Sequence, residues 1–211
     1  MSLSKKTIHY WNNFYSKKKV IKKPTKFALF CLKYLNSYSG ILFDAGCGNA
    51  RDTVFFNKKK INTIGLDISD SVIKINKKLN KRLQKKFIKK NFCNFFKKKI
   101  KSDFSVYLRF TIHTINHKSE KVFFNSLSKQ KNLNYLFIET RTTKDEFYKV
   151  GKKVGRNEYI SDHFRRFIVP KEIKKTLSKK FDIVFAKQST QFAKYKNFKP
   201  KVLRIIAKKK L

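Results

Sequence analysis

Acidic side chains are scarce in this chain. Thirteen Asp and Glu residues stand against 53 Lys and Arg residues, which gives a net charge of +40 at pH 7. Such a surface attracts polyanions, so nucleic acid, anionic membranes and anionic small molecules are all candidate partners. The lysines are spread along the whole chain, and Lys, Asn, Ile and Phe, which A/T-rich codons encode, are abundant. Codon bias therefore accounts for much of the charge, although not for the scarcity of acids, and non-specific nucleic-acid binding stays a secondary hypothesis.

Cysteine and long apolar stretches are also scarce. The three cysteines, Cys31, Cys47 and Cys93, are odd in number and show no metal-ligand spacing, which fits a reducing compartment. The best membrane-span candidate, FALFCLKYL, is short and is interrupted by Lys33. The first residues lack the apolar centre of a signal peptide. We therefore expect a soluble, cytoplasmic protein without a metal site and without membrane insertion.

Glycine and proline are few, and no linker or internal repeat divides the chain. The 211 residues are enough for one domain with a substantial core. Short apolar runs alternate with basic stretches of helical spacing, which is typical of βαβ units and a mostly parallel sheet. The strands are predicted at 41–45, 61–67, 87–92, 103–110, 134–140, 181–187 and 201–207.

Helices are predicted between these strands and before them. We expect helices around 11–15, over 26–35, over 51–56 and from Pro170 onward. Four apolar residues recur every fourth position and predict one buried stripe on a further helix: Ile75, Leu79, Leu83 and Phe87. The last two strands have no helix between them, so they are predicted to form an antiparallel hairpin at the sheet edge.

The segment ILFDAGCGNARD at 41–52 carries the most informative motif. Gly46 and Gly48 follow a buried strand and allow the tight turn and close ligand approach that a Cβ would prevent. Asp67 ends the next strand 21 residues after Gly46, where an acid can bind a ribose diol. Dinucleotide binding needs a small residue where this chain has Arg51, and a pyrophosphate gains nothing from Asp44. NAD is therefore the poorer fit.

The segment instead resembles motif I of class I S-adenosylmethionine-dependent methyltransferases, in which an acidic residue and a spacer precede G-x-G-x-G. Asp44, Gly46, Cys47 and Gly48 match it, and Ala50 replaces the third glycine. The resemblance implies that S-adenosyl-L-methionine is the cofactor and that this loop holds its methionine part. It also implies that Asp67 holds the ribose hydroxyl groups.

The resemblance extends over nearly the whole chain. Asn91 stands where the family has an acid near the adenine, and Phe92 would cover the ring; Ile68 and Arg109 are also assigned to the cofactor site. Within the superfamily the chain is similar to small bacterial enzymes of the tellurite-resistance and thiopurine-methyltransferase kind, on the segments GCGNARD, YWNNFY and YLRFTIH. This implies an α/β, Rossmann-like sheet of seven strands in the order 3-2-1-4-5-7-6, with helices on both faces. Residues 1–40 would cover the cofactor site of a methyltransferase domain at 41–211.

The methyl acceptor is expected beyond the ends of the fourth and fifth strands. Candidate catalytic residues there are His113, Glu139 and His163. Segment 141–169 has no clear periodicity, and we interpret it as an insertion that covers the substrate. Its candidate binding residues are Arg141, Tyr159, Arg165 and Arg166, and its arginines hint at an anionic acceptor.

Each of these residues also has a structural interpretation. His113 could cap a helix, Glu139 could pair with Arg141 or Arg165, and the arginine pair 165–166 could be solvated surface. Trp11, Phe14 and Tyr15 could close over the cofactor or dock a helix on the core.

We predict methyl transfer to a small acceptor by in-line displacement. The alternatives are an RNA or DNA methyltransferase and a non-catalytic cofactor-binding protein of the same fold. A D/N-P-P-Y/F motif after the fourth strand is absent, since YLRFTIH stands in its place, which argues against the common base-N-methylating type.

Overall fold

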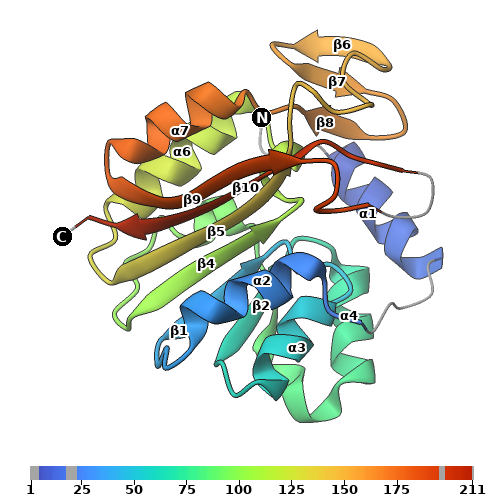
Figure 1. Cartoon of the computed structure of the whole chain (residues 1–211). Helices are drawn as coiled ribbons and strands as arrows, with labels where there is room; N and C mark the ends of the chain where they lie inside the picture. The colour runs from blue at the N-terminus through green and yellow to red at the C-terminus, as the bar shows by residue number, and fades with distance from the viewer. Residues whose placement is uncertain (1–4, 18–22, 195–197, 211) are drawn as a thin grey trace.

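Seven strands form one mostly parallel sheet. The computed structural model describes residues 5–17, 23–194 and 198–210. The parallel strands are β1 (Ile41–Ala45), β2 (Thr63–Asp67), β3 (Phe87–Lys89), β4 (Phe104–Arg109) and β5 (Leu133–Arg141). β9 (Phe181–Ser189) and β10 (Val202–Lys209) form an antiparallel hairpin, and β10 also pairs with β5. The order β3-β2-β1-β4-β5-β10-β9 confirms the predicted strand order and the hairpin at the sheet edge (Figure 1).

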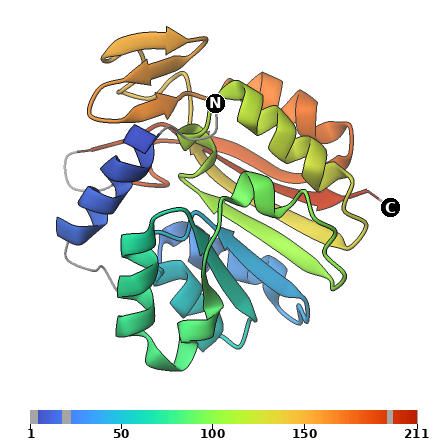
Figure 2. The same cartoon turned by 180° about the vertical axis from the view of Figure 1, so that it is seen from behind.

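Helices cover both faces of this sheet, as the two opposite views show (Figures 1 and 2). One face carries α2 (Lys26–Leu35), α3 (Arg51–Lys58) and α4 (Asp70–Leu79). The other face carries α5 (Phe92–Phe95), α6 (His117–Ser128) and α7 (Pro170–Ser178). Two short 3-10 helices, η1 (Lys81–Lys86) and η2 (Ile112–Thr114), complete the connections. The predicted α/β class is therefore correct. Among the described residues, no helix is long and apolar enough to span a membrane.

Side-chain alternation along β4 divides the core into two layers. Phe104, Val106 and Leu108 belong to the layer that packs against α5, α6 and α7. Tyr107 points to the opposite face, where its ring stacks on Phe27 of α2 with centroids 5.1 Å apart. Helices cover both faces of this parallel strand, so the side chains that point to either face are buried. This is why β4 is apolar along its whole length. Burying one such side chain contributes ~1.5–3 kcal/mol.

The prediction of one buried apolar stripe after the second strand is wrong. α4 ends at Leu79, whose side chain is 57% exposed, and its buried residues are Val72, Ile73 and Asn76. Phe87 belongs to β3 rather than to a helix. Because an α-helix turns once in about 3.6 residues, a strict four-residue spacing drifts around its surface instead of following one face.

Several predicted boundaries shift by a few residues. The third strand, predicted over 87–92, ends at Lys89 because Asn91 caps α5: its side chain accepts a hydrogen bond from the Cys93 N–H at 2.9 Å. The second strand begins at Thr63, two residues later than predicted, and the fifth begins at Leu133. All three cysteines are buried and free.

Segment 141–169 contains a second, antiparallel sheet that the sequence pattern did not indicate. Its strands are β6 (Lys152–Gly155), β7 (Glu158–Ile160) and β8 (Phe164–Arg166), in that order. The rings of Tyr148, Tyr159 and Phe167 pack against one another beside it. This small sheet stands beyond the carboxyl ends of the main strands, next to helix α1 (Lys5–Lys17) (Figure 1). Of the segment 1–40, residues 1–4 and 18–22 lie outside the described part.

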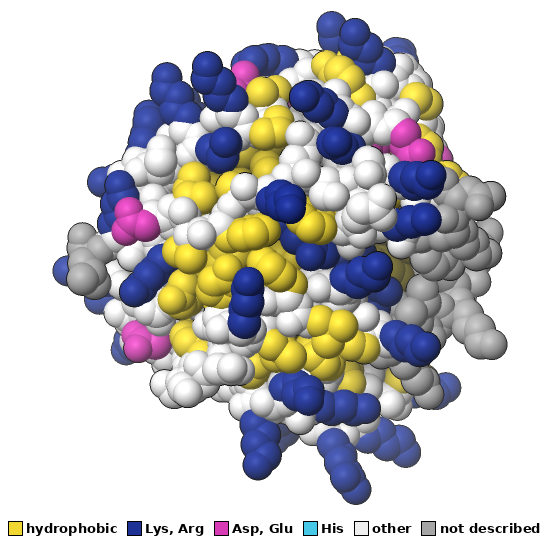
Figure 3. Space-filling model, viewed as in Figure 1, with side chains coloured by type: hydrophobic (Ala, Val, Ile, Leu, Met, Phe, Trp, Pro, Cys, Tyr) yellow, Lys and Arg dark blue, Asp and Glu magenta, His cyan; other side chains and the backbone are white. Residues whose placement is uncertain are grey.

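Basic side chains are distributed over the surface rather than gathered on one element. Figure 3 shows Lys and Arg side chains all over the visible face, with apolar patches between them and few acidic groups. Among the described residues, three lysines form ion pairs, Lys74, Lys89 and Lys210, so the positive charge of the surface is diffuse.

Candidate functional site

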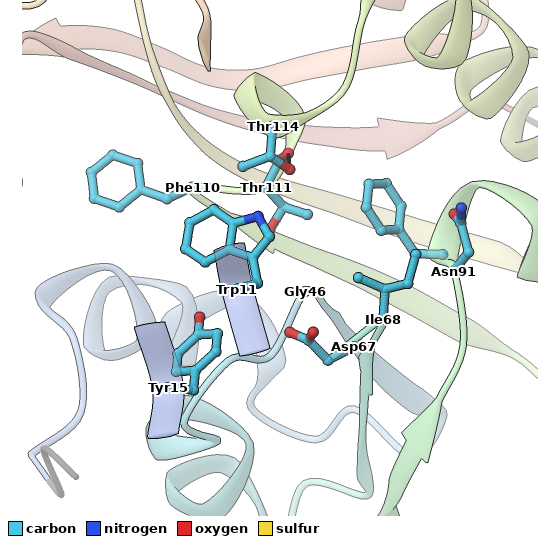
Figure 4. Close-up of a pocket in the computed structure, with 10 residues that line it drawn as sticks. Trp11, Tyr15, Gly46, Asp67, Ile68, Asn91, Phe110, Thr111 and Thr114 are labelled. Carbon is cyan, nitrogen blue, oxygen red and sulfur yellow. Dashed lines mark hydrogen bonds between the residues drawn. The ribbon is translucent and has the colours of Figure 1, made fainter. Parts of the chain in front are cut away.

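A pocket lies beyond the carboxyl ends of β1, β2 and β4, where open parallel sheets bind their ligands. Its walls come from the turn after β1, the ends of β2 and β4, the start of α5 and one face of α1 (Figure 4). The lining residues are Trp11, Tyr15, Gly46, Asp67, Ile68, Asn91, Phe92, Phe110, Thr111 and Thr114. Half of these were predicted from sequence as cofactor residues: Gly46, Asp67, Ile68, Asn91 and Phe92. The fold thus brings them together in one place.

The turn after β1 requires glycine at two positions. Gly46 and Gly48 have φ of +79° and +51°, in the left-handed region that other residues rarely adopt. A Cβ on Gly46 would lie 2.6 Å from Cγ2 of Thr111, and a Cβ on Gly48 would collide with the hydroxyl oxygen of Tyr15. The Gly46 N–H donates to the Leu66 carbonyl at 2.7 Å, which holds the turn against β2. The backbone therefore forms the floor of the pocket.

Asp67 presents a carboxylate at the end of β2. One oxygen accepts a hydrogen bond from the Gly48 N–H at 2.9 Å and the other accepts from the Ser69 N–H at 2.9 Å. Burial raises the pKa of this carboxyl above 3.8, while these backbone hydrogen bonds act to lower it. The side chain is 8% exposed, so it meets solvent through the pocket that it lines.

Helix α1 covers the pocket with aromatic side chains. The rings of Trp11 and Tyr15 stack with centroids 6.0 Å apart, and both line the cavity. Ser69, which follows β2, donates a hydrogen bond to Asn12 on the same helix at 2.7 Å. The remaining cavity measures about 60 Å³. That is room for a few water molecules, and it is well below the ~300–1,000 Å³ of typical small-molecule sites. Trp11 and Tyr15 of α1 therefore narrow the pocket in this conformation.

Asp44 lies beneath the turn and does not line the pocket. It accepts a hydrogen bond from the Thr53 hydroxyl at 2.6 Å, and burial, followed by the charge of Asp52, raises its pKa to about 7. Asp52 in turn accepts hydrogen bonds from Thr25 and from the Tyr107 hydroxyl. This polar network joins α2, α3 and β4 below the glycine turn. Cys47 and Gly48 belong to the same turn but make none of the pocket surface described.

Glu139 on β5 lies between two arginines on the neighbouring strands. Arg109 on β4 and Arg204 on β10 are its partners in the strand register. The Arg109 Nε donates to one carboxylate oxygen at 3.1 Å and the Arg204 Nε donates to the other at 2.6 Å. The pairing predicted with Arg141 or Arg165 is therefore wrong. The strand register places Arg109 and Arg204 beside Glu139 instead. Neither Glu139 nor Arg109 lines the pocket.

Phe110 follows β4 and presents its ring to the pocket from an unusual backbone conformation. Its φ is +53°, and its N–H donates to the Glu139 carbonyl at 2.8 Å. A left-handed conformation costs a bulky residue ~1–3 kcal/mol and persists where the surroundings impose it. The guanidinium carbons of Arg109 and Arg141 lie 4.6 and 5.5 Å from the ring centroid.

His113, a candidate catalytic residue, lies behind Phe110 rather than on the pocket wall. The two rings meet edge to face at 5.5 Å. The imidazole is buried, and among the described residues its Nδ1 has no hydrogen-bond partner. Burial, and then the positive charge of Arg141, lower the pKa of His113 well below 6.5. His113 is therefore neutral near pH 7.

His163, the third candidate, contacts α1 across the gap between the helix and the small sheet. Its ring stacks on Tyr10 at 4.6 Å and meets Trp11 at 5.2 Å. Asp162 links the two parts, because it accepts a hydrogen bond from the Tyr10 hydroxyl and is paired with Arg165. Burial, followed by the charge of Arg165, lowers the pKa of His163 to about 4. These contacts therefore join the small sheet to α1.

The other residues assigned to the substrate have internal partners. Arg141 donates to Asp145 at 2.7 Å, and its guanidinium lies 5.2 Å from the Phe147 ring. Arg166 is buried, donates to the Ile115 carbonyl at 3.0 Å and pairs with Glu120. Tyr159 is buried in the aromatic cluster beside the small sheet. None of these side chains lines the pocket, so the structure does not gather them with the cofactor candidates.

Two lining residues were missed by sequence reasoning, Thr111 and Thr114. The Thr111 hydroxyl donates to the Ala45 carbonyl at 2.8 Å, and the Thr114 hydroxyl donates to the Thr111 carbonyl at 2.7 Å. They stand three residues apart, Thr111 as the residue before the 3-10 helix η2 and Thr114 as its last residue. The sequence signal for these two residues was the three-residue spacing of threonines directly after a strand whose end lies at the ligand-binding edge of the sheet.

Comparison with known proteins finds similar structures but no matching sequence family. No family model matches the chain, and no curated protein matches it. A methyltransferase from Methanosarcina mazei, described as S-adenosylmethionine-dependent, superposes with a TM-score of 0.71 at 14% identity, over 85% of this chain and 97% of that one. The 1,6-didemethyltoxoflavin-N1-methyltransferase of Burkholderia thailandensis, with bound S-adenosylhomocysteine, gives 0.68 at 14% identity, over 98% and 85%.

TehB from Haemophilus influenzae gives a TM-score of 0.64 at 12% identity, over 95% of this chain and 67% of that one. Identities this low establish the fold and nothing finer. The chain has the fold of S-adenosylmethionine-dependent methyltransferases of known structure.

Proposed function

We propose that this protein binds S-adenosyl-L-methionine in the pocket under α1 and transfers its methyl group to a small acceptor. The observation that carries the proposal is the position of Asp67. Its carboxylate lies at the end of the strand next to the glycine turn, in one pocket with Gly46 and Asn91, within a fold that methyltransferases share. An acid at the end of the strand next to a glycine turn is placed where such folds bind a ribose hydroxyl group.

The residues present suit this cofactor in chemistry. The backbone of Gly46 offers a surface without a Cβ, which a methionine moiety can approach closely. The Asp67 carboxylate can accept hydrogen bonds from ribose hydroxyl groups, and Ile68 and Phe92 supply apolar walls for a purine. The Asn91 side-chain amide remains able to donate, since its oxygen is the atom that caps α5. The bound cofactor would supply an activated methyl group on a sulfonium.

The space for the cofactor depends on α1. A cavity of about 60 Å³ is too small for a nucleoside, and Trp11 and Tyr15 occupy its mouth. We therefore propose that α1 moves outward when the cofactor binds and that segment 1–40 then covers it. The small sheet in 141–169, linked to α1 through Tyr10 and Asp162, would cover the acceptor.

An anionic acceptor remains part of the proposal, with a structural condition attached. Arg141, Arg165 and Arg166 each pair with an internal carboxylate. A substrate anion would have to exchange with one of these carboxylates, most readily Asp162, whose side chain is 57% exposed. Arg165→Ala should then raise the KM for the acceptor and leave cofactor affinity unchanged. An unchanged KM would exclude Arg165 from acceptor binding.

The proposal is tested by labelled-methyl transfer. Purified protein is incubated with S-adenosylmethionine carrying a labelled methyl group and the small-molecule fraction of a cell extract. Wild type should transfer label to a compound, and Asp67→Ala should transfer much less. Cofactor binding without transfer to any fraction would instead support the non-catalytic alternative. Transfer to RNA with strong salt dependence would support a nucleic-acid methyltransferase.

A further inference from the structure

Helix α1 is attached to the domain less firmly than helix α2. None of the α1 side chains that the structure describes, at 8–16, is fully buried, whereas α2 buries four side chains in the core. A hydrogen bond from Ser69 to Asn12, at 2.7 Å, ties α1 to the main domain. An element with few buried contacts opens at a low cost in free energy. We therefore expect α1 to open separately from the rest of the domain.

Two residues at the turn between β7 and β8, Asp162 and His163, hold α1 from the side of the small sheet (Figures 1 and 2). The Tyr10 hydroxyl donates to an Asp162 oxygen at 3.1 Å, and the Tyr10 ring stacks on His163 with centroids 4.6 Å apart. Trp11 meets the same imidazole at 5.2 Å. Because Trp11 also lines the pocket, these contacts bear directly on how far the pocket is closed.

The Tyr10 hydroxyl and the Asp162 carboxylate are a donor and a charged acceptor. Burial, followed by the charge of Asp162, raises the pKa of Tyr10 to about 12, so the hydroxyl keeps the proton that it donates. Burial acts to raise the pKa of Asp162, but hydrogen bonds from Arg165 and Ser161 hold it below the usual value. The carboxylate is therefore charged.

Asp162 is fixed mainly by its own segment. Arg165 donates to both carboxylate oxygens, at 2.5 and 3.3 Å, and the Ser161 hydroxyl donates to one of them at 2.9 Å. Helix α1 contributes the bond from Tyr10. When α1 and the small sheet separate, the break therefore falls between Tyr10 and Asp162, and Asp162 stays with Arg165.

We propose that Asp162 and His163 form a latch that holds α1 over the pocket in the free protein, and that the Tyr10–Asp162 hydrogen bond breaks before S-adenosylmethionine enters. The cavity of about 60 Å³ left beside Trp11 and Tyr15 is too small for a nucleoside, so entry requires the open state. The inference rests on the proposed function, since that function names the ligand. The fraction of molecules with the latch open then limits the rate of binding.

Hydrogen exchange of the ligand-free protein measures how often α1 opens. An isolated helix of 13 residues is marginally stable in water, so the α1 amides exchange when the helix leaves the domain. Tyr10→Phe removes the hydroxyl and keeps the ring, and Asp162→Ala removes the acceptor. In both variants the α1 amides should exchange about threefold to tenfold faster, the effect of losing a hydrogen bond to a half-exposed carboxylate.

Two further variants connect the effect to this bond. The double variant of Tyr10→Phe and Asp162→Ala should exchange no faster than Asp162→Ala alone, because both changes remove the same interaction. Tyr148→Phe is the matched control: it removes a hydroxyl that bonds to Asn157 at 2.8 Å beside the same small sheet, and it should leave the α1 amides unchanged. Thermal unfolding checks that each variant folds.

The association of S-adenosylhomocysteine then tests whether the latch limits entry. Trp11 is the one tryptophan of the chain, so its fluorescence follows α1 in stopped flow. Association with Tyr10→Phe and with Asp162→Ala should be faster than with wild type by the same factor as the exchange of the α1 amides.

The outcomes separate the latch from the cofactor assignment. Unchanged exchange of the α1 amides in both single variants, or additive effects in the double variant, would overturn the latch. Faster exchange with an unchanged association rate would also overturn it, while the binding itself would support the cofactor assignment. Faster exchange in a protein that binds no S-adenosylhomocysteine would support the latch and refute the cofactor assignment.

Discussion

Asp67→Asn gives the sharpest test of how the pocket recognises its ligand. The substitution keeps the shape of the side chain but replaces a carboxylate, which has two accepting oxygens, by an amide with one. In wild type the two oxygens accept from the Gly48 and Ser69 N–H groups, each at 2.9 Å. One of these donors would therefore lose its partner and face an NH₂ group.

Two effects of Asp67→Asn on stability oppose each other. Leaving a buried N–H without a partner costs about 1–3 kcal/mol. The wild-type carboxylate, however, is itself penalised by burial, which raises its pKa, and the neutral amide escapes that penalty. We therefore expect the free energy of unfolding to fall by roughly 1 kcal/mol, a change that leaves the protein folded at room temperature.

The effect on affinity should be larger. A hydrogen bond to a charged group contributes about 1.5–3 kcal/mol, so the dissociation constant for S-adenosylhomocysteine should rise by at least about tenfold. Isothermal titration calorimetry measures the affinity, and urea unfolding measures the stability. Asp182→Asn, an exposed acid on β9, is the matched control and should change neither. An affinity for Asp67→Asn within twofold of wild type would refute the role assigned to this carboxylate.

The remaining predictions concern the turn, the cover and the buried charges. Gly46→Ala should lower the melting temperature and abolish cofactor binding, because its Cβ would lie 2.6 Å from Thr111 at a φ of +79°; normal binding would show that the turn can relax. Tyr15→Ala should speed the association of S-adenosylhomocysteine in stopped flow, because it empties part of the pocket mouth, and an unchanged rate would exclude α1 as the barrier. Glu139→Gln should destabilise the fold by about 3–5 kcal/mol in urea unfolding, because it leaves the buried Arg204 and the partly buried Arg109 without a countercharge; a loss below about 1 kcal/mol would contradict this. Burial raises the pKa of Asp44 from 3.8 to about 7. As the pH rises, the folded state therefore keeps the proton on Asp44 up to a higher pH than the unfolded chain does. The stability from that proton is fully present below pH 3.8 and is lost as the pH rises to about 7. Asp44→Asn should therefore flatten the fall in stability over this range, and an identical slope in the variant would show that Asp44 is ionised throughout.

The parts of the fold that follow local rules could be predicted from the sequence. The strand 41–45 and the helix 26–35 have the predicted bounds, since Gly46 ends the strand that the apolar residues 41–43 begin, and the Thr25 cap starts the helix. The strand order was predicted through the family resemblance, and the hairpin was predicted from the absence of a helix between the last two strands. Of the five predicted lining residues, Gly46 and Asp67 follow from the ends of two adjacent parallel strands, and Ile68, Asn91 and Phe92 were assigned through the family resemblance.

What could not be predicted depends on contacts between distant segments. The partners of Glu139 come from strands 30 and 65 residues away and follow from register, which the sequence pattern does not specify. The small sheet escaped prediction because its strands are three or four residues long and β6 is exposed, so no apolar alternation marks it. Thr111 and Thr114 were missed because threonines in a short turn have the same sequence appearance as threonines in any other loop.

The central claim is that the pocket beside Asp67 and Gly46 binds S-adenosylmethionine, and one calorimetric titration tests it most directly. S-adenosylhomocysteine is titrated into wild-type protein, with NAD as the comparison ligand that shares an adenosine moiety. The account predicts saturable one-to-one binding of S-adenosylhomocysteine, lost in Gly46→Val, and no saturable binding of NAD. No heat and no rise in melting temperature with S-adenosylhomocysteine, or tighter binding of NAD, would contradict it.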